Sequence, residues 1–258
     1  MKLAITGKGG VGKTTLASVL ARLYASEGQT VLAIDADPDA NLGAALGVSS
    51  DELSRVTPIA QMKELIHERT GGQPGTIGGF FKLNPEVADI PERFSVNKDG
   101  VKLLVLGTVK KGGSGCICPE SALLKSLLNH LFLRVDDIVV LDMEAGIEHL
   151  GRATAEGVDA FITVVEPGMR SLDTARAVRK LAADLGIKKC YVVGNKINND
   201  ADRQFISDRL TDFDVLGFMS QNPKIAEADR RGVSPFDIDS QVVSEVKEIR
   251  ERLESLSK

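Results

Sequence analysis

The chain has 258 residues, of which 43% are hydrophobic and 26% charged, a composition typical of a globular protein and not of a disordered or fibrous one. Its 36 acidic residues outnumber its 32 lysines and arginines, and the net charge of -4 argues against a dominant nucleic-acid-binding surface. No run approaches the roughly 18 apolar residues of a membrane span. Glycines and lysines follow within a few residues of the N-terminus, too soon for the apolar core of a secretory signal. We therefore expect a cytoplasmic protein that is not integral to a membrane.

Short β-rich runs alternate with helical patterns along the chain. The expected strands cover residues 2–6, 30–34, 101–106, 137–141, 160–165, 190–193 and 215–218, and the expected helices cover 13–26, 119–132, 170–185, 200–210 and 240–256. Strands this apolar are buried on both faces, which predicts an α/β fold with a mostly parallel sheet and helices on each side. We expect a single domain over residues 1–258, interrupted by a loop-rich insertion at about 71–98.

The first expected strand leads into the sequence GKGGVGKT at residues 7–14, which fits the phosphate-binding loop (P-loop) pattern between a strand and a helix. Glycines let backbone N–H groups close around phosphate oxygens, and the positive helix end attracts the anion. We expect Lys13 to reach the β and γ phosphates and Thr14 to hold Mg²⁺. The predicted nucleotide contacts are Gly9, Gly10, Val11, Gly12, Lys13, Thr14 and Thr15.

A second lysine, Lys8, stands near the start of this loop. A lysine at this place marks the deviant P-loop ATPases, the group that contains ParA, MinD, the arsenical pump ATPase and nitrogenase iron protein, and the chain resembles that group throughout its core. The resemblance implies a nucleotide-dependent homodimer in which Lys8 touches the partner's nucleotide and assists catalysis, much as an arginine finger does.

Two acidic side chains follow expected strands beside this loop. The resemblance places the first switch at residues 35–41, where Asp37 is expected to orient the attacking water and lie near Mg²⁺. Asp142 ends an apolar strand as a Walker B carboxylate does, and is expected near the same ion. Carboxylates at strand ends can merely cap helices, but two of them beside a P-loop favour the functional interpretation.

The sequence GNKIN at residues 194–198 resembles a base-reading motif. Guanine recognition normally uses an aspartate that accepts two hydrogen bonds, whereas Asn198 offers one acceptor oxygen and a donor group. We therefore expect adenine, with ATP and ADP as ligands and Asn195 as the base contact. The segment at residues 165–167 resembles a further segment that lines such nucleotide sites, so Glu166 is expected to line the site here.

Cys116 and Cys118 form a CxC motif directly before Pro119. Residues two apart on an extended chain point the same way, so both thiols can face one metal ion. Pro119 suits the first position of a helix, whose positive end favours thiolate over thiol. A twofold dimer with both pairs on its axis would supply four sulfurs, which suits Zn²⁺ or, with adjusted geometry, Ni²⁺. A CxC alone is a weak motif, and a purely structural role stays open.

Residues 115–120 and 142–150 together resemble the CooC family of carbon monoxide dehydrogenase maturation ATPases. This resemblance covers nearly the whole chain and implies a cytoplasmic, Mg²⁺-dependent ATPase that dimerises with nucleotide. It also implies that Cys116 and Cys118 bind Ni²⁺, with Zn²⁺ as an alternative in vitro, for insertion into carbon monoxide dehydrogenase as the client. Glu144 departs from the pattern, where a small residue is expected.

Two rival functions on the same fold are open to test. An iron-sulfur reductase of the nitrogenase type needs a cysteine in the second switch, where this chain has Ala145, although a cluster held by CxC pairs alone stays open. A MinD-like positioning ATPase needs a membrane-targeting terminal helix. The apolar stripe of residues 240–256 has a polar face of mixed charge, so we expect it to dock on the protein body.

Cys190 is expected to be a core residue.

Overall fold

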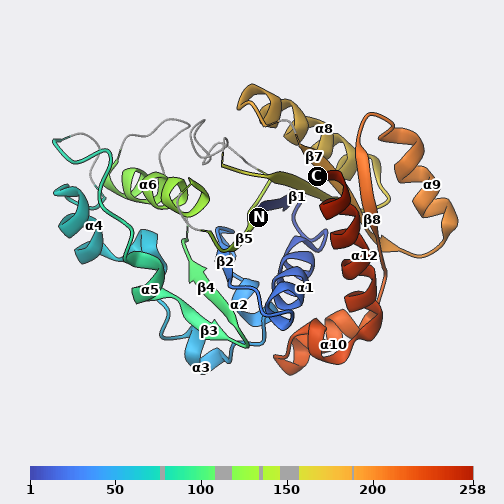
Figure 1. The fold of residues 1–258 in the computed structure, drawn as a ribbon, viewed down its shortest axis with the longest axis horizontal. Coiled ribbons are helices and arrows are strands. Elements are labelled where there is room, and N and C mark those ends of the chain that lie inside the picture. The colour runs from blue at the N-terminus through green and yellow to red at the C-terminus, as the bar shows by residue number, and fades with distance from the viewer. Residues whose placement is uncertain (76–78, 108–117, 134–135, 146–156, 188, 258) are drawn as a thin grey trace.

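The computed structural model describes residues 1–258 except 76–78, 108–117, 134–135, 146–156, 188 and 258 (Figure 1). Its strands are β1 (Lys2–Gly7), β2 (Val31–Asp35), β3 (Val96–Lys98), β4 (Val101–Val105), β5 (Ile138–Asp142), β6 (Ala160–Val165), β7 (Cys190–Ile197) and β8 (Asp214–Ser220). They form an eight-stranded sheet in the order β3-β4-β2-β5-β1-β6-β7-β8. β3 pairs antiparallel with β4, and every other neighbouring pair is parallel.

Helices cover both faces of this sheet (Figure 1). They are α1 (Lys13–Ser26), α2 (Leu42–Ala45), α3 (Ser50–Leu53), α4 (Lys63–Thr70), α5 (Ile90–Phe94), α6 (Pro119–Leu133), α8 (Met169–Asp184), α9 (Asp200–Arg209), α10 (Pro223–Arg231), α11 (Pro235–Ile238), α12 (Ser240–Ser257) and the 3₁₀ turn η1 (Ile59–Gln61). One apolar core joins the sheet to α1 and α12, and two others join it to α6, α8 and α9 on the opposite side. The predicted α/β fold with helices on both faces is confirmed.

All the strands and helices expected from the sequence are present, with ends shifted by a few residues. The structure adds helices that were not expected, α2, α3, α4, α10 and α11, and the expected loop-rich insertion at 71–98 also contains α5 and β3. β3 and β4 are joined by Asp99 and Gly100, whose φ angles are 48° and 83°. Two successive residues with positive φ form the tight turn that matches the twist of a β-hairpin. The insertion therefore ends in a hairpin that extends the sheet.

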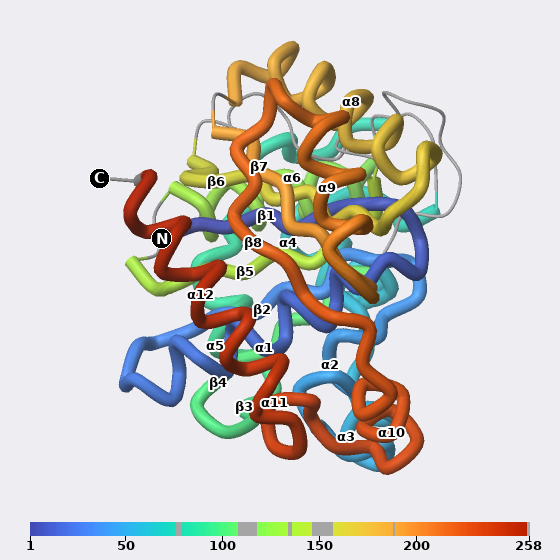
Figure 2. The backbone as a smooth tube through the Cα atoms, turned by 90° about the vertical axis from the view of Figure 1, so that its right-hand side faces the viewer, coloured from blue at the N-terminus to red at the C-terminus, as the bar shows by residue number. Residues whose placement is uncertain are grey.

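Helix α12 lies along α1 and β8 (Figure 2). Its apolar stripe faces the protein, because Val242, Val246, Ile249 and Leu253 are all buried in the core shared with α1. Docking of this helix on the body of the protein is confirmed. Within the described part of the chain, no helix has the length and apolar character needed to cross a membrane.

The parallel arrangement decides where the polar residues meet. β1, β2, β5, β6 and β7 are parallel neighbours, so their carboxyl ends share one edge of the sheet. The P-loop, the two acidic segments and the base-reading motif all lie at the carboxyl ends of these strands. Ligands of open α/β sheets bind at this edge, outside the carboxyl ends of the strands.

Candidate functional site

The P-loop joins β1 to α1, and glycine is required at both of its ends. Gly7 has a φ of 149°, and a Cβ there would lie 2.4 Å from the carbonyl oxygen of Val164 on β6. Gly12 has a φ of 97°, and a Cβ there would lie 2.0 Å from Nδ2 of Asn195. Gly12 caps α1 without a side-chain hydrogen bond, and the first turn carries no acidic residue. The positive end of the helix is therefore available to an anion.

The side chains that follow Gly12 meet the predicted switch and Walker B carboxylates. The Nζ of Lys13 is buried and lies 3.6 Å from Oδ2 of Asp37. The hydroxyl of Thr14 donates a hydrogen bond of 2.6 Å to Oδ2 of Asp142. The structure thus brings the predicted lysine, threonine and two aspartates together, although they come from three separate segments. Thr15 follows on α1 and is half-buried.

The donor set suits Mg²⁺. Oδ1 of Asp142 is buried and has no hydrogen-bond partner among the described residues. A buried carboxylate oxygen without a partner is costly, and a bound cation would satisfy it. Thr14 and Asp37 supply two further oxygens of the hard kind that Mg²⁺ prefers. Burial raises the pKa of Asp142 to about 6, even though the Thr14 hydrogen bond and the Lys13 charge act against this rise.

Asp35 is a buried site residue that the sequence interpretation did not single out. Its Oδ1 accepts the N–H of Asp37 at 3.2 Å, and its Oδ2 accepts the N–H of Leu42 at 2.9 Å. One carboxylate at the end of β2 therefore holds Asp37 of the first switch segment and Leu42, which directly follows that segment. Burial raises the pKa of Asp35 to about 7, against the effect of these two hydrogen bonds, and the neighbouring charge of Asp142 adds to the rise.

A raised carboxyl pKa has a defined effect on stability. The folded protein holds this proton more tightly than the unfolded chain, so the Asp35 contribution to stability is lost as the pH rises from about 4 towards 7. Relative to wild type, the Asp35→Asn variant should gain unfolding free energy over this range, by at most about 1.4 kcal/mol per pH unit, and level off above it. Urea unfolding at several pH values, without nucleotide or Mg²⁺, measures the difference. A difference that is constant with pH would contradict this assignment.

The base-reading motif lies beside the P-loop. Asn195 is buried, and its Nδ2 donates a hydrogen bond of 2.7 Å to the carbonyl oxygen of Val11. Glu166 pairs with Lys196, the Nζ of Lys196 lying 3.0 Å from Oε2 of Glu166. Asn198 is exposed, and its amide donates to the Lys196 carbonyl oxygen. The predicted base contacts of Asn195 and Glu166 stay predictions, while the structure gives both side chains contacts within the protein.

Lys8, Gly9 and Gly10 are exposed at the outer turn of the P-loop. The Lys8 carbonyl oxygen accepts the N–H of Val11 at 3.4 Å, which closes the turn. The Lys8 side chain is thus presented at the surface of the P-loop. Its role in a partner's site stays a prediction.

Of the CxC motif, Cys116 lies outside the described residues, as do residues 146–148 of the second switch. Cys118 is buried and immediately precedes α6, and its Sγ lies 3.2 Å from the hydroxyl oxygen of Ser121. The thiol therefore stands at the N-terminal end of α6. The described residues contain no group of three or more His, Cys, Asp or Glu side chains placed to hold a metal ion.

The insertion packs against the same end of α6. Oε1 of Glu120 accepts the N–H of Gly75 at 2.5 Å, and a Cβ on Gly72 would lie 2.5 Å from Cγ of Pro119. The other carboxylate oxygen of Glu120 is buried without a hydrogen-bond partner among the described residues. Residues 71–75 are thus fixed to the helix turn that follows Cys118.

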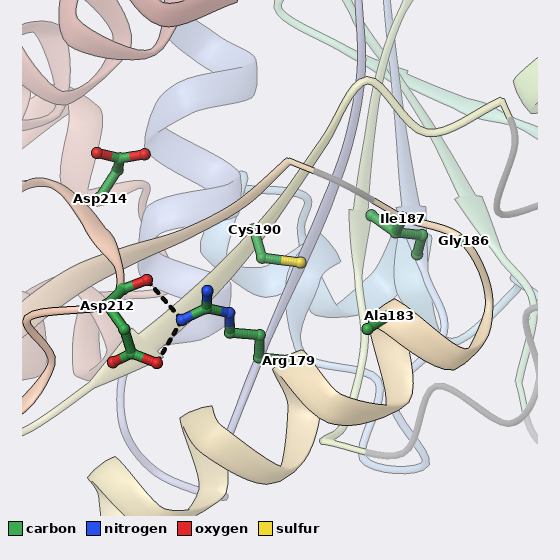
Figure 3. Close-up of a pocket in the computed structure, with 7 residues that line it drawn as sticks. All are labelled: Arg179, Ala183, Gly186, Ile187, Cys190, Asp212 and Asp214. Carbon is green, nitrogen blue, oxygen red and sulfur yellow. Dashed lines mark hydrogen bonds and ion pairs between the residues drawn. The ribbon is translucent and has the colours of Figure 1, made fainter.

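Cys190 lies apart from Cys118. It begins β7, at the amino edge of the sheet, and faces a cavity of about 480 Å³ between β7 and α8 (Figure 3). Arg179 crosses this cavity to hydrogen-bond Asp212. Burial raises the pKa of the half-buried Cys190 thiol. The predicted core role is supported by its packing against the core that holds α6 and α8.

Comparison with known families identifies the class of protein. A model of the CobQ/CobB/MinD/ParA nucleotide binding domain matches residues 2–236. The chain therefore belongs to this family of P-loop nucleotide-binding proteins. It is also 51% identical to the carbon monoxide dehydrogenase accessory protein CooC of Rhodospirillum rubrum, over 92% of this chain and 90% of that protein. Within the family the chain belongs with CooC, and the resemblance expected from the sequence is confirmed.

Other relatives agree with this placement. An uncharacterized ATP-binding protein of Methanocaldococcus jannaschii is 43% identical over 96% of each chain. Among solved structures, a chain of the MinC:MinD cell division protein complex of Aquifex aeolicus has a TM-score of 0.70, with 20% identity, and the match covers 99% of this chain and 96% of that one. A plasmid partition protein of Borrelia burgdorferi bound to AMPPNP has a TM-score of 0.69, with 18% identity, over 99% of each chain. These two structures show the shared fold.

Proposed function

We propose that this protein is an ATP-hydrolysing metallochaperone that binds nickel at a dimer-interface CxC site and assists nickel insertion into carbon monoxide dehydrogenase. The observation that carries the proposal is the 51% identity with the accessory protein CooC over nearly the whole chain. The assembled Lys13, Thr14, Asp37 and Asp142 cluster supports the ATPase part. A cytoplasmic location, as predicted from the sequence, is part of this proposal.

The ATPase step follows from the side chains at the sheet edge. Backbone N–H groups of residues 9–15 and the Lys13 amine bind the phosphates, and the Asp37 carboxylate orients a water molecule against the γ-phosphorus. The water oxygen bonds to that phosphorus as its bond to the bridging oxygen breaks, giving ADP, inorganic phosphate and a proton. Bound Mg²⁺ would neutralise charge on the phosphate oxygens, with Thr14, Asp37 and Asp142 as its protein ligands.

Nickel is the cargo in this proposal. Cys116 and Cys118 of each protomer supply two thiolates, and a twofold dimer axis joins four around one ion. Cys118 immediately precedes the turn of α6 that is bound to the insertion through Glu120. A client protein that contacts the insertion would therefore act on the helix next to the metal ligand.

Loss of Lys8 should separate nucleotide binding from hydrolysis. Because Lys8 is exposed and is proposed to act in the partner's site, Lys8→Ala should leave monomer affinity for ATP within about twofold while lowering turnover by about 100-fold or more. Steady-state phosphate release and light scattering with ATP measure hydrolysis and dimerisation. Lys180→Ala, which removes an exposed lysine from α8, is the matched control. Unchanged turnover in Lys8→Ala would reject a role across the dimer.

Nucleotide state should change nickel affinity. If ATP closes the dimer and nickel bridges it, each ligand prefers the closed state and must strengthen the other's binding. We expect nickel affinity to be about 5- to 150-fold higher with a non-hydrolysable ATP analogue than with ADP, and Lys8→Ala to shrink this difference. Metal competition against a chelator, at protein concentrations spanning dimerisation, is the test. Equal affinities in the two states would show that nucleotide does not gate the metal.

The rival positioning function receives less support from the structure. MinD-like solved structures share the fold at 20% identity or less, which carries no information on membrane targeting. A membrane-binding terminal helix would need an exposed apolar face. In α12 the residues of that face, including Val246 and Leu253, are buried in the protein core. The iron-sulfur alternative rests on Cys116 and Cys118 alone, and the metal measurement in the Discussion separates it from nickel binding.

A further inference from the structure

Asn195 connects two segments that are 184 positions apart, the base-reading motif and the P-loop. Its Nδ2 donates to the Val11 carbonyl oxygen at 2.7 Å, in a buried position. It also fills the space beside Gly12, where a Cβ would lie 2.0 Å from the same nitrogen. The side chain thus both hydrogen-bonds the loop and packs against it.

The hydrogen bond fixes the direction of one P-loop amide. The described peptide bonds are all trans, and a trans peptide is planar, with its C=O and N–H pointing in opposite directions. Holding the Val11 carbonyl oxygen towards β7 therefore turns the Gly12 N–H away from β7. P-loops bind phosphate with backbone N–H groups, so the orientation of this peptide decides whether Gly12 can donate to a phosphate.

Asn195 is itself held in place by the residue that follows it. Its Oδ1 accepts the backbone N–H of Lys196 at 2.8 Å. Lys196 has a φ of 58°, rare for a residue with a side chain, and lies where the pairing of β7 with β8 is irregular. Its Nζ pairs with Glu166 on the neighbouring segment. Such a backbone conformation is strained and persists where the surroundings require it.

We propose that Asn195 is a positioning residue for phosphate binding, which orients the Val11–Gly12 peptide so that the P-loop can hold the phosphates whatever base is attached. This inference rests on the proposed ATP site and assigns the motif a role besides base contact. Lys196 on β7 holds this side chain through its backbone N–H, and Glu166, which follows β6, pairs with the Lys196 amine. The base-reading motif would then form part of the phosphate site.

Inorganic triphosphate tests this role, because it has phosphates and no base. We expect Asn195→Ala to weaken binding of Mg²⁺-triphosphate, ATP and GTP by a similar factor, about tenfold, leaving the preference for ATP over GTP unchanged. Competition against a fluorescent ATP analogue gives all three affinities. Gln204→Ala is the matched control, since it removes an exposed amide side chain whose hydrogen bonds are with Asp208 on the same helix, α9.

The triphosphate result is decisive. Unchanged triphosphate affinity in Asn195→Ala would overturn the inference, whatever happens to ATP. If that variant fails to fold, Asn195→Ser replaces it in the experiment. The serine side chain is shorter and leaves the Val11 carbonyl oxygen without this donor. Hydrogen exchange of the P-loop peptide should be faster in either variant. A wild-type protein that binds neither ATP nor triphosphate would reject the proposed function as well, whereas wild-type binding with an unaffected variant would reject this inference alone.

Discussion

Replacement of Lys13 by alanine is expected to abolish productive ATP binding. Its Nζ is buried beside Asp37, at the start of α1, and in the proposed site it is the charge that the P-loop places against the β and γ phosphates. Hydrogen bonds to charged groups are the strong ones, so affinity for ATP should fall on the order of 100-fold and turnover should be undetectable. Isothermal titration with ATP and Mg²⁺ measures the first effect, and phosphate release measures the second.

A second buried lysine provides the control for Lys13. Lys2 is also on the β1–α1 segment, and its Nζ donates to the Asp137 carbonyl oxygen at the opposite edge of the sheet. Lys2→Ala removes a buried lysine of similar exposure without touching the nucleotide site, so it should lower stability and keep ATP affinity. ATP affinity in Lys13→Ala that matched Lys2→Ala would contradict the assigned role of Lys13.

Substitution of either CxC cysteine should remove most of the metal bound by the dimer. In a symmetric dimer, Cys116→Ser or Cys118→Ser removes two of four thiolate ligands at once, so affinity should fall by several orders of magnitude. Native mass spectrometry should find one nickel or zinc ion per wild-type dimer and none in either variant. The same spectra would reveal the mass of an iron-sulfur cluster if the rival function were correct.

Cys190 provides the control for the metal site. It begins β7 at the amino edge of the sheet, away from the P-loop edge, and it lines the cavity crossed by Arg179 (Figure 3). Cys190→Ser should therefore bind metal with wild-type stoichiometry. Metal retained by the double variant Cys116→Ser, Cys118→Ser would refute the CxC site, and two ions per wild-type dimer would refute a shared one.

Local sequence patterns predicted most of the fold and much of the site. The P-loop can be identified because its glycines and Lys13 lie within eight consecutive positions, and Asp142 because it ends a buried strand. β3 was missed because three residues containing Asn97 and Lys98 give no apolar alternation. The signal that could have found it is Asp99-Gly100, a dipeptide typical of tight hairpins.

Two site features depend on contacts that residue types do not specify. Asp35 binds the backbone N–H groups of Asp37 and Leu42, and backbone groups are the same at almost every position. Asn195 reaches the Val11 carbonyl only because parallel pairing of β1, β6 and β7 places their carboxyl ends together. The spacing of residues along the chain does not specify the strand order. Such long-range contacts can therefore be identified only once the strand order is known.

Nickel occupancy of carbon monoxide dehydrogenase is the measurement that tests the proposed function most directly. The dehydrogenase is produced at limiting nickel in cells that lack this protein, and in the same cells supplied with wild type, Lys13→Ala or Cys118→Ser. We expect purified enzyme with full nickel content and activity only with wild type, and excess nickel should reduce the difference. Full nickel occupancy in the absence of this protein, at limiting nickel, would contradict a role in nickel insertion.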